Sequence, residues 1–381
     1  MAMGNQSGLS WLPQGLTTIE RFMTSSEAGS SRKIPYLDGL RGYSILSVVV
    51  LHVVGSRHVP RWLVPAHLLF GNGRLGVHVF FAISGFLITT LLLREVDLTG
   101  TISLRGFYQR RIARIFPAAY LYIAAIALLV CIGVVQTHWG AFLAASLFCW
   151  NYGVALNLLT YTPDELIFDH FWSLSLEEQF YLFWPGCLLL LGPIRSRSIA
   201  IVSIVLLPFA RIASYALFPK SRFQLSAMFH LGIDEIFWGA LVALAYARGT
   251  HLKLKGNRWL GWLTLAYAVV TIFVLTPAID QVPGLGRFVV PTAYSSFASL
   301  LLLWLLSGDT GIIRAALQWR PLCWVGVISY SLYVWQELFL AVKPVELPFP
   351  FNVGCAFLAA ILSYYLVESP LRKKFQVFFK R

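Results

Sequence analysis

The chain has 381 residues, of which 57% are hydrophobic and only 12% are charged, and its mean hydropathy is +0.69. A soluble domain carries about twice that charged fraction, so the composition excludes an ordinary soluble protein and predicts a membrane protein with many spans. The net charge of +13 comes from basic residues between apolar runs, where they set orientation and can meet anionic lipid or ligand, and it does not favour nucleic-acid binding.

Residues 1–33 are polar and lack the apolar core of a signal peptide. They predict a cytoplasmic N-terminal tail with one short helix near Leu16–Met23. Residues 34–370 are dominated by apolar runs and predict a single transmembrane domain, in which we detect no internal repeat. Residues 371–381 are basic and predict a cytoplasmic C-terminal tail.

Apolar runs follow one another along the chain, most of them near the 20 residues that span a bilayer. Arginine and lysine clusters between them mark cytoplasmic segments, of which the clearest is 94–115. Between that segment and Arg195 lie three runs, whereas parity allows only two full crossings. The runs lie at about 37–55, 75–93, 116–135, 139–158, 171–191, 198–217, 231–247, 259–276, 289–306, 322–341 and 351–367.

Of the three runs between segment 94–115 and Arg195, the run 139–158 is the weakest, because Asn151, Tyr152 and Asn157 interrupt its end. We therefore expect it to be re-entrant or interfacial and packed within protein. The predicted fold is an all-α, polytopic transmembrane helix bundle of about ten spans plus that one segment, with both termini in the cytoplasm. The segment 56–74 fits its expected outer position poorly, because it holds three arginines.

The first run, IPYLDGLRGYSILSVVVLHVV, carries Arg41 and His52 eleven residues apart. Eleven residues make about three helical turns, so both side chains share one face about 16 Å apart along the axis. Asp38 lies three residues before Arg41 and can pair with it. Asp38 and Arg41 can be interfacial anchors, and His52 can be a structural histidine. The functional alternative makes His52 a proton acceptor near neutral pH.

The second run, GVHVFFAISGFLITTLLL, adds His78 as a weaker histidine candidate. Its step at Ser84–Phe86 contains small residues, which let neighbouring helices approach closely. We expect this step to serve helix packing.

The loop sequence LRGFYQRRIARIFP contains a cluster of arginines. Arg111 and Arg114 are three apart and share a helix face, and Arg110 adds a third guanidinium. They can be plain positive-inside charge, or they can clamp phosphate groups, since guanidinium forks match phosphate oxygens. In the second case Phe107 and Tyr108 could support an adenine ring.

The stretch HFWSLSLEEQFYLFWPGCLLLL, residues 170–191, has the length of a span yet carries Glu177 and Glu178 in its first half. A charge at the centre of a bilayer helix costs roughly 2.5–3.5 kcal/mol on insertion scales. Either the helix starts at the membrane surface with both glutamates among the headgroups, or the pair forms a polar site at the mouth of the bundle. Polar neighbours favour the second interpretation, and they are Trp172, Ser173, Ser175, Gln179 and Tyr181.

No GxSxG, HExxH, Walker or dinucleotide motif occurs in a fitting context, which disfavours a serine hydrolase or a zinc enzyme. Intramembrane histidine, glutamate and arginine suit either an enzyme or a proton-coupled transporter of a polar or anionic solute. The lack of a detectable repeat argues against the transporter. A scaffold for polysaccharide assembly would leave the buried charges without a purpose.

Taken in order, these motifs resemble the membrane acyltransferase-3 family of bacterial envelope O-acyltransferases. The resemblance covers nearly the whole chain, and the glutamate stretch is its most specific part. The matching pieces are LDGLRG at Leu37–Gly42, the Arg41-x10-His52 pair, GVHVFFAISGFLI at Gly76–Ile88, RRIARIFPAAY at Arg110–Tyr120, FWSLSLEEQFYLFWP at Phe171–Pro185, ISYSLYVWQ at Ile328–Gln336 and the final VESPLRK from Val367.

The resemblance implies ten spans, a coenzyme A-linked acyl donor on the cytoplasmic side and acylation of envelope sugars or related acceptors. It also implies roles for Arg41, His52, Arg111, Arg114 and the glutamate pair. Two positions depart from it: relatives often carry Asp where His78 stands, and Gln336 replaces the histidine that usually follows Trp335. Some relatives append an extracytoplasmic esterase-like domain; without one, we expect transfer to finish in the membrane domain or on a partner.

We therefore expect an O-acyltransferase of the bacterial inner membrane that moves an acyl group, acetyl in the first instance, from acetyl-CoA to a glycan hydroxyl. The acceptor is a cell-envelope polysaccharide, a lipid-linked glycan or a similar molecule, and membrane lipids are the other partners. O-antigen, exopolysaccharide, a lipo-oligosaccharide and a macrolide all suit the motifs. No metal is expected.

His52 is the expected general base, with direct attack of the acceptor on the thioester or a transient acyl-histidine as alternatives. Glu178 or Glu177 would orient or recharge this histidine. Arg41 would position the acyl group. The other expected site residues are Arg110, Arg111 and Arg114 at the donor phosphates, with Asp38, Trp172, Ser173 and Gln179 at the substrate.

Overall fold

The computed structural model describes residues 34–55, 73–160, 163–218, 225, 227–275, 286–308, 310–340 and 347–378. These residues fold into helices, with no strand among them, as the predicted all-α class requires. The expected N-terminal tail with its short helix, most of the arginine-containing segment 56–74 and the last residues of the C-terminal tail lie outside the described ranges.

Six helical segments within these ranges are long and apolar enough to cross a membrane. They lie in α2 (Pro35–Gly55), α4 (Gly73–Thr99), α5 (Leu104–Cys131), α7 (Phe171–Leu217), α13 (Gly286–Ser307) and the C-terminal segment Phe351–Phe375. That last segment consists of α17 (Phe351–Leu362), the π-helix η7 (Ser363–Glu368) and α18 (Ser369–Phe378). By length and composition, the described residues therefore contain fewer candidate membrane spans than the ten or so that the sequence predicted.

Breaks within the apolar runs account for the difference. Two predicted runs form the single element α7, which has a non-helical kink at Gly192 with φ 71° and ψ 170°. The left-handed φ is accessible to glycine at little cost, so the chain can turn there. Shorter helices cover the other runs: α8 (Phe229–Gly232), α9 (Asp234–Ala247), α11 (Arg258–Val269) with the π-helix η5 (Val270–Leu275), α15 (Arg320–Val327) and α16 (Ser329–Leu340).

The stretch 139–158 is not one continuous helix. It consists of α6 (Trp139–Ser146), the short 3₁₀ helix η2 (Trp150–Tyr152) and irregular chain, with a positive φ at Phe148 and Asn157. A second 3₁₀ helix, η3 (Pro163–Phe168), leads into α7. This broken geometry fits a segment packed within protein, and its failure to cross the bilayer stays a prediction.

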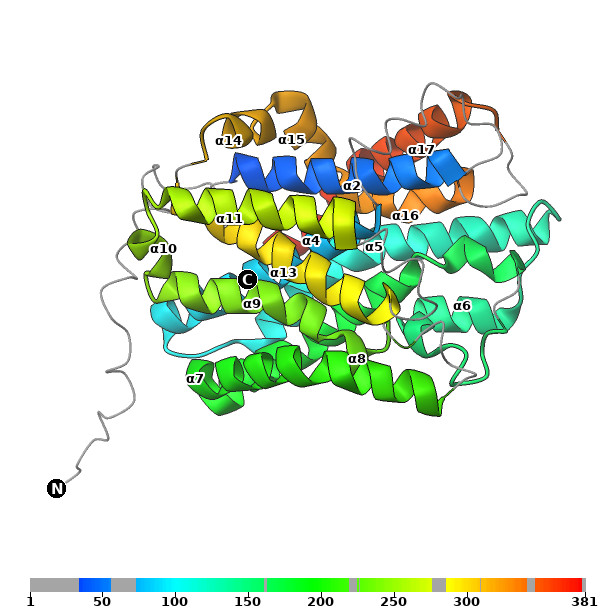
Figure 1. Ribbon diagram of the computed structural model, residues 1–381. Coiled ribbons are helices and arrows are strands. Elements are labelled where there is room, and N and C mark those ends of the chain that lie inside the picture. Colours follow the sequence, from blue (N-terminus) through cyan, green and yellow to red (C-terminus); the bar gives the residue numbers. More distant parts are fainter. Residues whose placement is uncertain are drawn as a thin grey trace.

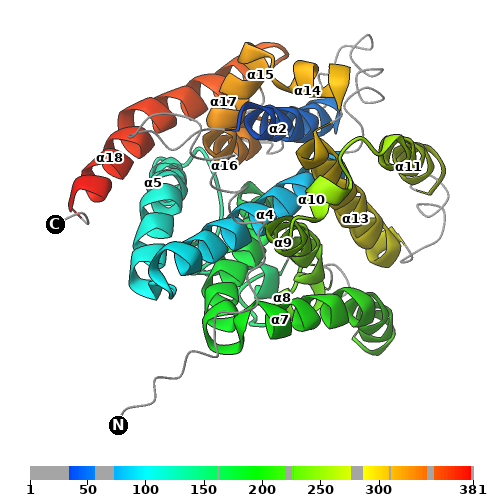
Figure 2. The ribbon, with the colours of Figure 1, turned by 90° about the vertical axis from the view of Figure 1, so that its left-hand side faces the viewer.

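Helix α4 occupies the centre of the bundle and packs against α2, α7, α9 and α13 (Figure 2). In the side view of Figure 1 many of the long helices run roughly along one direction. Helices α4 and α9 approach each other closely: a Cβ on Gly85 would lie 2.2 Å from the Ile236 carbonyl oxygen, and one on Gly239 would lie 2.0 Å from the Ala82 oxygen. The small-residue step at Ser84–Phe86 therefore serves helix packing, as the sequence predicted.

Helix α2, which carries the first run, also packs tightly against α15, which lies in the run 322–341. A Cβ on Gly326 of α15 would lie 1.8 Å from the Asp38 carbonyl oxygen of α2. Backbones that meet this closely fix the position of the Arg41 end of α2. The short helices α10 (Thr250–Lys253) and α14 (Gly311–Leu317) complete the described elements.

Candidate functional site

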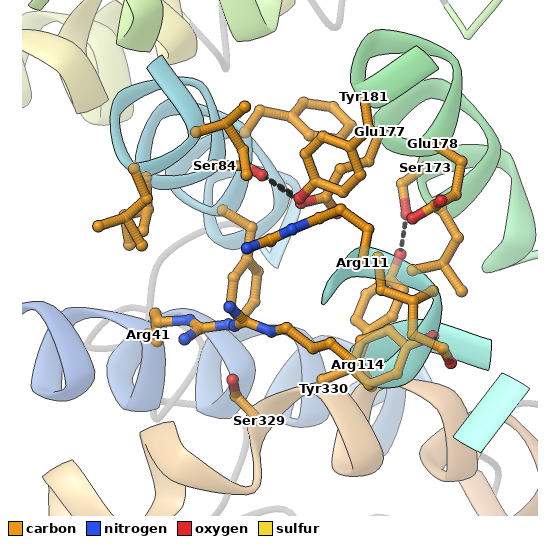
Figure 3. Close-up of a pocket in the computed structure, with 18 of the residues that line it drawn as sticks. Arg41, Ser84, Arg111, Arg114, Ser173, Glu177, Glu178, Tyr181, Ser329 and Tyr330 are labelled. Carbon is orange, nitrogen blue, oxygen red and sulfur yellow. Dashed lines mark hydrogen bonds between the residues drawn. The ribbon is translucent and has the colours of Figure 1, made fainter. Parts of the chain in front are cut away.

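A cavity of about 280 Å³ lies between α2, α4, α5, α7 and α16. Its walls are largely apolar, from residues such as Phe80, Phe81 and Leu87. Arginines and carboxylates both line it: the arginines are Arg41, Arg111 and Arg114, and the carboxylates are Asp38, Glu177 and Glu178. We call this space the arginine cavity. Figure 3 shows Arg111 and Arg114 extending from α5 toward Arg41 on α2.

Local sequence explains how α5 presents its two arginines. Ser103 caps the helix start by accepting a hydrogen bond from the Gly106 N–H at 3.2 Å. The i, i+3 spacing then directs Arg111 and Arg114 to the same side. The Arg111 guanidinium lies 5.6 Å from the centre of the Tyr181 ring, and its Nε is buried without a hydrogen-bond partner among the described residues. Arg111 therefore retains a buried donor for a ligand.

Arg110 does not take part in this arrangement. Its Nη2 lies 2.9 Å from Oε2 of Glu95, and its side chain is 56% exposed. The expected three-arginine clamp from the loop is thus reduced to two arginines. The reason is helical geometry, because adjacent residues point about 100° apart around the axis. Arg41 of α2 supplies the third guanidinium instead.

The glutamate pair lines the arginine cavity, as the polar-site interpretation of residues 170–191 expected. Both glutamates lie about two turns into α7, which begins at Phe171. Ser84 of α4 and Tyr181, one turn further along α7, both donate hydrogen bonds to Oε1 of Glu177 (Figure 3). Glu177 therefore has hydroxyl partners from two helices, which fixes it within the low-dielectric interior.

The four residues expected at the substrate divide into two groups. Asp38 and Ser173 line the cavity. Trp172 instead packs its ring edge-on against Phe81, at 6.0 Å between ring centres. Gln179 forms two 2.9 Å hydrogen bonds with Asn151 and donates another to the Phe148 carbonyl, so it ties α7 to the broken stretch 139–158.

A second cavity of about 270 Å³ adjoins the arginine cavity. The two share Asp38, Arg41, Arg114 and Tyr330 in their walls. The remaining lining residues of the second cavity are Ala113, Val327, Tyr364, Glu368 and Arg372. Arginine side chains therefore continue from the interior toward the basic α18.

His52 lies outside both of these cavities, at the other end of α2 from Arg41. Its Nδ1 is 2.5 Å from Oε1 of Gln336, and its Nε2 is 3.9 Å from Oε2 of Glu337. The same carboxylate oxygen lies 4.0 Å from Nδ1 of His170. We call these four residues the His52 cluster. The histidine is 26% exposed, whereas Glu337 and His170 are buried.

The carboxylate beside His52 is thus Glu337, whereas the sequence had suggested Glu177 or Glu178. The structure separates the two regions but connects them through hydroxyl groups. Ser173 and Tyr333, both in the wall of the arginine cavity, lie 2.5 Å apart. Both hydroxyl oxygens also lie within reach of the His170 carbonyl, at 3.1 and 3.4 Å, so one of them donates to that carbonyl and the other donates to the neighbouring hydroxyl.

Sequence reasoning missed Glu337 and His170. A signal for Glu337 was present, because it is an ionisable residue inside the apolar run 322–341. It follows Gln336, which the sequence had already singled out. His170 is the first residue of the glutamate stretch, and only tertiary packing brings it to Glu337.

His78 belongs to a separate buried group. Its Nδ1 lies 3.1 Å from the Ser295 hydroxyl and 3.2 Å from Oε2 of Glu235. Next to Glu235, Asp234 receives two hydrogen bonds from Arg211, at 2.7 and 3.0 Å. These ionisable groups join α4, the second half of α7 and α9, and they are fully or nearly fully buried. Among the described residues, no three His, Cys, Asp or Glu side chains form a group that could hold a metal ion.

Comparison with known proteins gives one family and several relatives. A family model described as an acyltransferase domain matches residues 34–368. YrhL of Bacillus subtilis (strain 168), which carries the name of a peptidoglycan O-acetyltransferase, is 28% identical over 380 residues, covering 92% of this chain and 57% of its own length. The O-acetyltransferase OatA of Staphylococcus aureus (strain NCTC 8325 / PS 47) is 28% identical over 369 residues, covering 91% of this chain and 58% of its own. The chain thus spans less than two thirds of either relative, and no solved structure matches it.

Proposed function

Since the chain belongs to the acyltransferase family whose model covers residues 34–368, we propose that it is a membrane O-acyltransferase. It moves an acetyl group from acetyl-CoA to a hydroxyl of a cell-envelope glycan. The names of its relatives support this choice, because they describe O-acetyltransferases and, for one of them, peptidoglycan as the acceptor. A transporter, the rival suggested by the buried charges, finds no such support.

The arginine cavity is the proposed donor site. The observation that carries this proposal is the convergence of Arg41, Arg111 and Arg114 from two helices, with a buried Nε on Arg111 that has no hydrogen-bond partner in the part of the chain that the structure describes. Guanidinium groups bind phosphate oxygens in charge-assisted pairs, and coenzyme A carries phosphates at its nucleotide end. The adjoining cavity extends this basic path to Arg372, at the start of the basic tail that the sequence predicts to be cytoplasmic. The donor therefore enters from the cytoplasmic side.

The glutamates have a supporting part in this donor site. Glu177 and Glu178 face the arginines, and Ser84 and Tyr181 fix Glu177 in place. Three arginines without counter-charges would repel one another in the membrane interior. We therefore propose that the two glutamates stabilise the cavity before the donor binds and that they orient Arg111.

His52 is the proposed general base. It stands about 16 Å along α2 from Arg41, a gap that the long pantetheine arm of coenzyme A can bridge. Its Nε2 takes the proton of the acceptor hydroxyl while that oxygen attacks the thioester carbonyl. The carbon–sulfur bond then breaks, and the proton passes to the departing coenzyme A sulfur. In a stepwise variant the imidazole itself carries the acetyl group before the acceptor takes it.

Location follows from the same proposal. The chain is a multi-pass protein of the bacterial inner membrane, with residues 34–370 as its acyltransferase domain and both tails in the cytoplasm. His52 then lies deeper in the membrane than the donor phosphates, toward the face where envelope glycans are assembled.

The direct test is acetyl transfer by the purified full-length chain in detergent. The protein is incubated with isotope-labelled acetyl-CoA and peptidoglycan fragments, and the products are analysed by mass spectrometry. We expect fragments that are heavier by one labelled acetyl group, and no such product with His52→Gln. A chain that neither binds nor consumes acetyl-CoA would contradict the proposed function; consumption without a heavier fragment would overturn peptidoglycan as the acceptor.

A further inference from the structure

Gln336 links His52 to the carboxylate of Glu337. Its Oε1 lies 2.5 Å from His52 Nδ1, and its Nε2 donates a 3.0 Å hydrogen bond to Oε2 of Glu337. Both Gln336 and Glu337 are buried. One amide group is therefore held between an imidazole and a carboxylate, with no exposed surface of its own.

The carboxylate determines which way this amide points. An amide offers one acceptor oxygen and one donor nitrogen. If the amide of Gln336 were turned over, its oxygen would face the Glu337 oxygen at the same close distance, two acceptors without a proton between them. Such a contact between buried acceptors is costly in the protein interior. The amide nitrogen therefore belongs on the Glu337 side, and the amide oxygen on the His52 side.

This orientation decides where His52 carries its proton. Because Oε1 of Gln336 can only accept, Nδ1 of His52 must donate. A neutral imidazole with its proton on Nδ1 keeps a lone pair on Nε2. The 3.9 Å between Nε2 and Glu337 is longer than a hydrogen bond, so the carboxylate does not accept one from Nε2 and does not hold a proton on that atom.

We propose that Gln336 is a positioning residue that holds His52 in the Nδ1–H tautomer, so that Nε2 is the atom that accepts the proton of the acceptor hydroxyl. This inference rests on the proposed acyl transfer. When Nε2 takes the proton, the ring becomes a cation facing Glu337, and the nearby carboxylate stabilises it. When the proton leaves with the coenzyme A sulfur, the ring returns to the same tautomer, because the amide has not moved.

The tautomer can be measured without any turnover. The full-length chain is labelled with ¹⁵N-histidine in detergent, and the His52 signals are identified as those missing from His52→Gln. Free histidine in water favours the Nε2–H form, so a ring held in the Nδ1–H form can be distinguished from an unconstrained histidine. We expect Nδ1–H in the wild type, a shift toward Nε2–H in Gln336→Met, and no change in Asn352→Leu, which removes a buried amide from the neighbouring α17. An Nε2–H ring in the wild type, or an unchanged ring in Gln336→Met, overturns the proposal.

Kinetics separate positioning from structure. Gln336→Met should lower kcat by about 10- to 100-fold, a part of the roughly 10²- to 10⁴-fold that a positioned base contributes, with the KM for acetyl-CoA unchanged. Gln336→Glu keeps an acceptor for Nδ1–H, so it should retain the tautomer and more activity than Gln336→Met. If Gln336→Met acetylates the acceptor at the wild-type rate, Gln336 has no positioning role although the proposed function stands. If the wild type transfers no acetyl group, the proposed function fails, while the tautomer measurement still decides the geometry.

Discussion

At the scale of single residues, neighbouring arginines have different environments. Arg111 and Arg114 enter the arginine cavity, whereas Arg110 pairs with Glu95 at the surface. An exposed ion pair contributes little, at a median of about 0–1 kcal/mol, because water and salt screen it. Buried guanidinium groups that meet a phosphate act in a less screened environment. Substitutions at these three positions therefore compare exposed and buried arginines within a single helix.

We expect Arg111→Ala and Arg114→Ala each to weaken acetyl-CoA binding by about tenfold or more. A hydrogen bond to a charged group is worth about 1.5–3 kcal/mol, and each variant removes at least one such bond. Arg110→Ala should leave the dissociation constant within about twofold of the wild type, as expected for an exposed pair. Isothermal titration calorimetry in detergent measures all three. If all three variants bind acetyl-CoA equally well, Arg111 and Arg114 do not bind the donor and serve only as positive charges on the cytoplasmic side.

His52→Gln should still bind acetyl-CoA but lose transfer by about 10²- to 10⁴-fold, because glutamine can hydrogen-bond yet cannot take up a proton. The side chain is of similar size and partly exposed, so the fold should tolerate the change. Binding is measured by calorimetry and transfer by mass spectrometry on the same preparation. Transfer at the wild-type rate would show that the base is another residue, and Glu337 would be the next to test.

Spacing rules predicted part of this site from the sequence. The i, i+3 relation placed Arg111 and Arg114 together, and the eleven-residue spacing placed Arg41 and His52 on one face of α2. Those rules act within a helix and give no information about which helix lies opposite. Glu337 meets His52 across 285 residues of chain, and Gln179 turns toward Asn151 instead of the cavity. Both facts depend on how helices pack, which a single sequence does not specify.

At the scale of helices, the bundle depends on small residues where α4 meets α9. Gly85 and Gly239 face the opposite backbone so closely that neither leaves room for a methyl group. The apolar runs correctly predicted that helices would form, but not where they would break. Gly192 bends α7 between two runs, and α15 and α16 divide the run 322–341. Hydropathy averages over such breaks, because an apolar residue contributes equally on either side of one.

Gly239→Ala should destabilise the protein by about 1–3 kcal/mol, the usual cost of overpacking, because its Cβ would lie 2.0 Å from the Ala82 oxygen. The matched control is Gly354→Ala in α17, where a Cβ would meet nothing within 4 Å. There alanine should be neutral or stabilising by up to about 1 kcal/mol, because it favours helix over glycine. Thermal unfolding in detergent reports both, and similar midpoints for the two variants would argue against the close α4–α9 contact.

At the scale of the whole molecule, the two polar regions lie at different depths of the bundle. The arginine cavity adjoins the basic α18, and the His52 cluster lies about 16 Å further along α2, roughly half the 30 Å thickness of the bilayer core. The reaction proposed here therefore crosses part of the membrane, with the nucleotide held on one side and the acetyl group delivered toward the other.

This orientation can be tested by cysteine accessibility in intact cells, using a chain whose five native cysteines are replaced. Leu166→Cys, in the exposed part of η3, should react with a membrane-impermeant maleimide from the periplasmic side. Arg197→Cys, exposed beyond the Gly192 kink, should react only after permeabilisation. Labelling of Leu166→Cys only after permeabilisation would mean that 139–158 crosses the membrane, and the ten-span topology would be wrong.

The buried pair between Arg211 and Asp234 also has a consequence for biogenesis. Arg211 leaves the ribosome 23 residues before its partner, in a helix whose other side chains are largely directed outward. An arginine in a lone span costs up to roughly 2.5–3.5 kcal/mol during insertion, the figure for the bilayer centre, and at that moment nothing neutralises it. The nascent second half of α7 should therefore remain beside the translocon until α9 emerges. We expect the two segments to move into lipid together as a hairpin, which would make the order of synthesis part of how this bundle assembles.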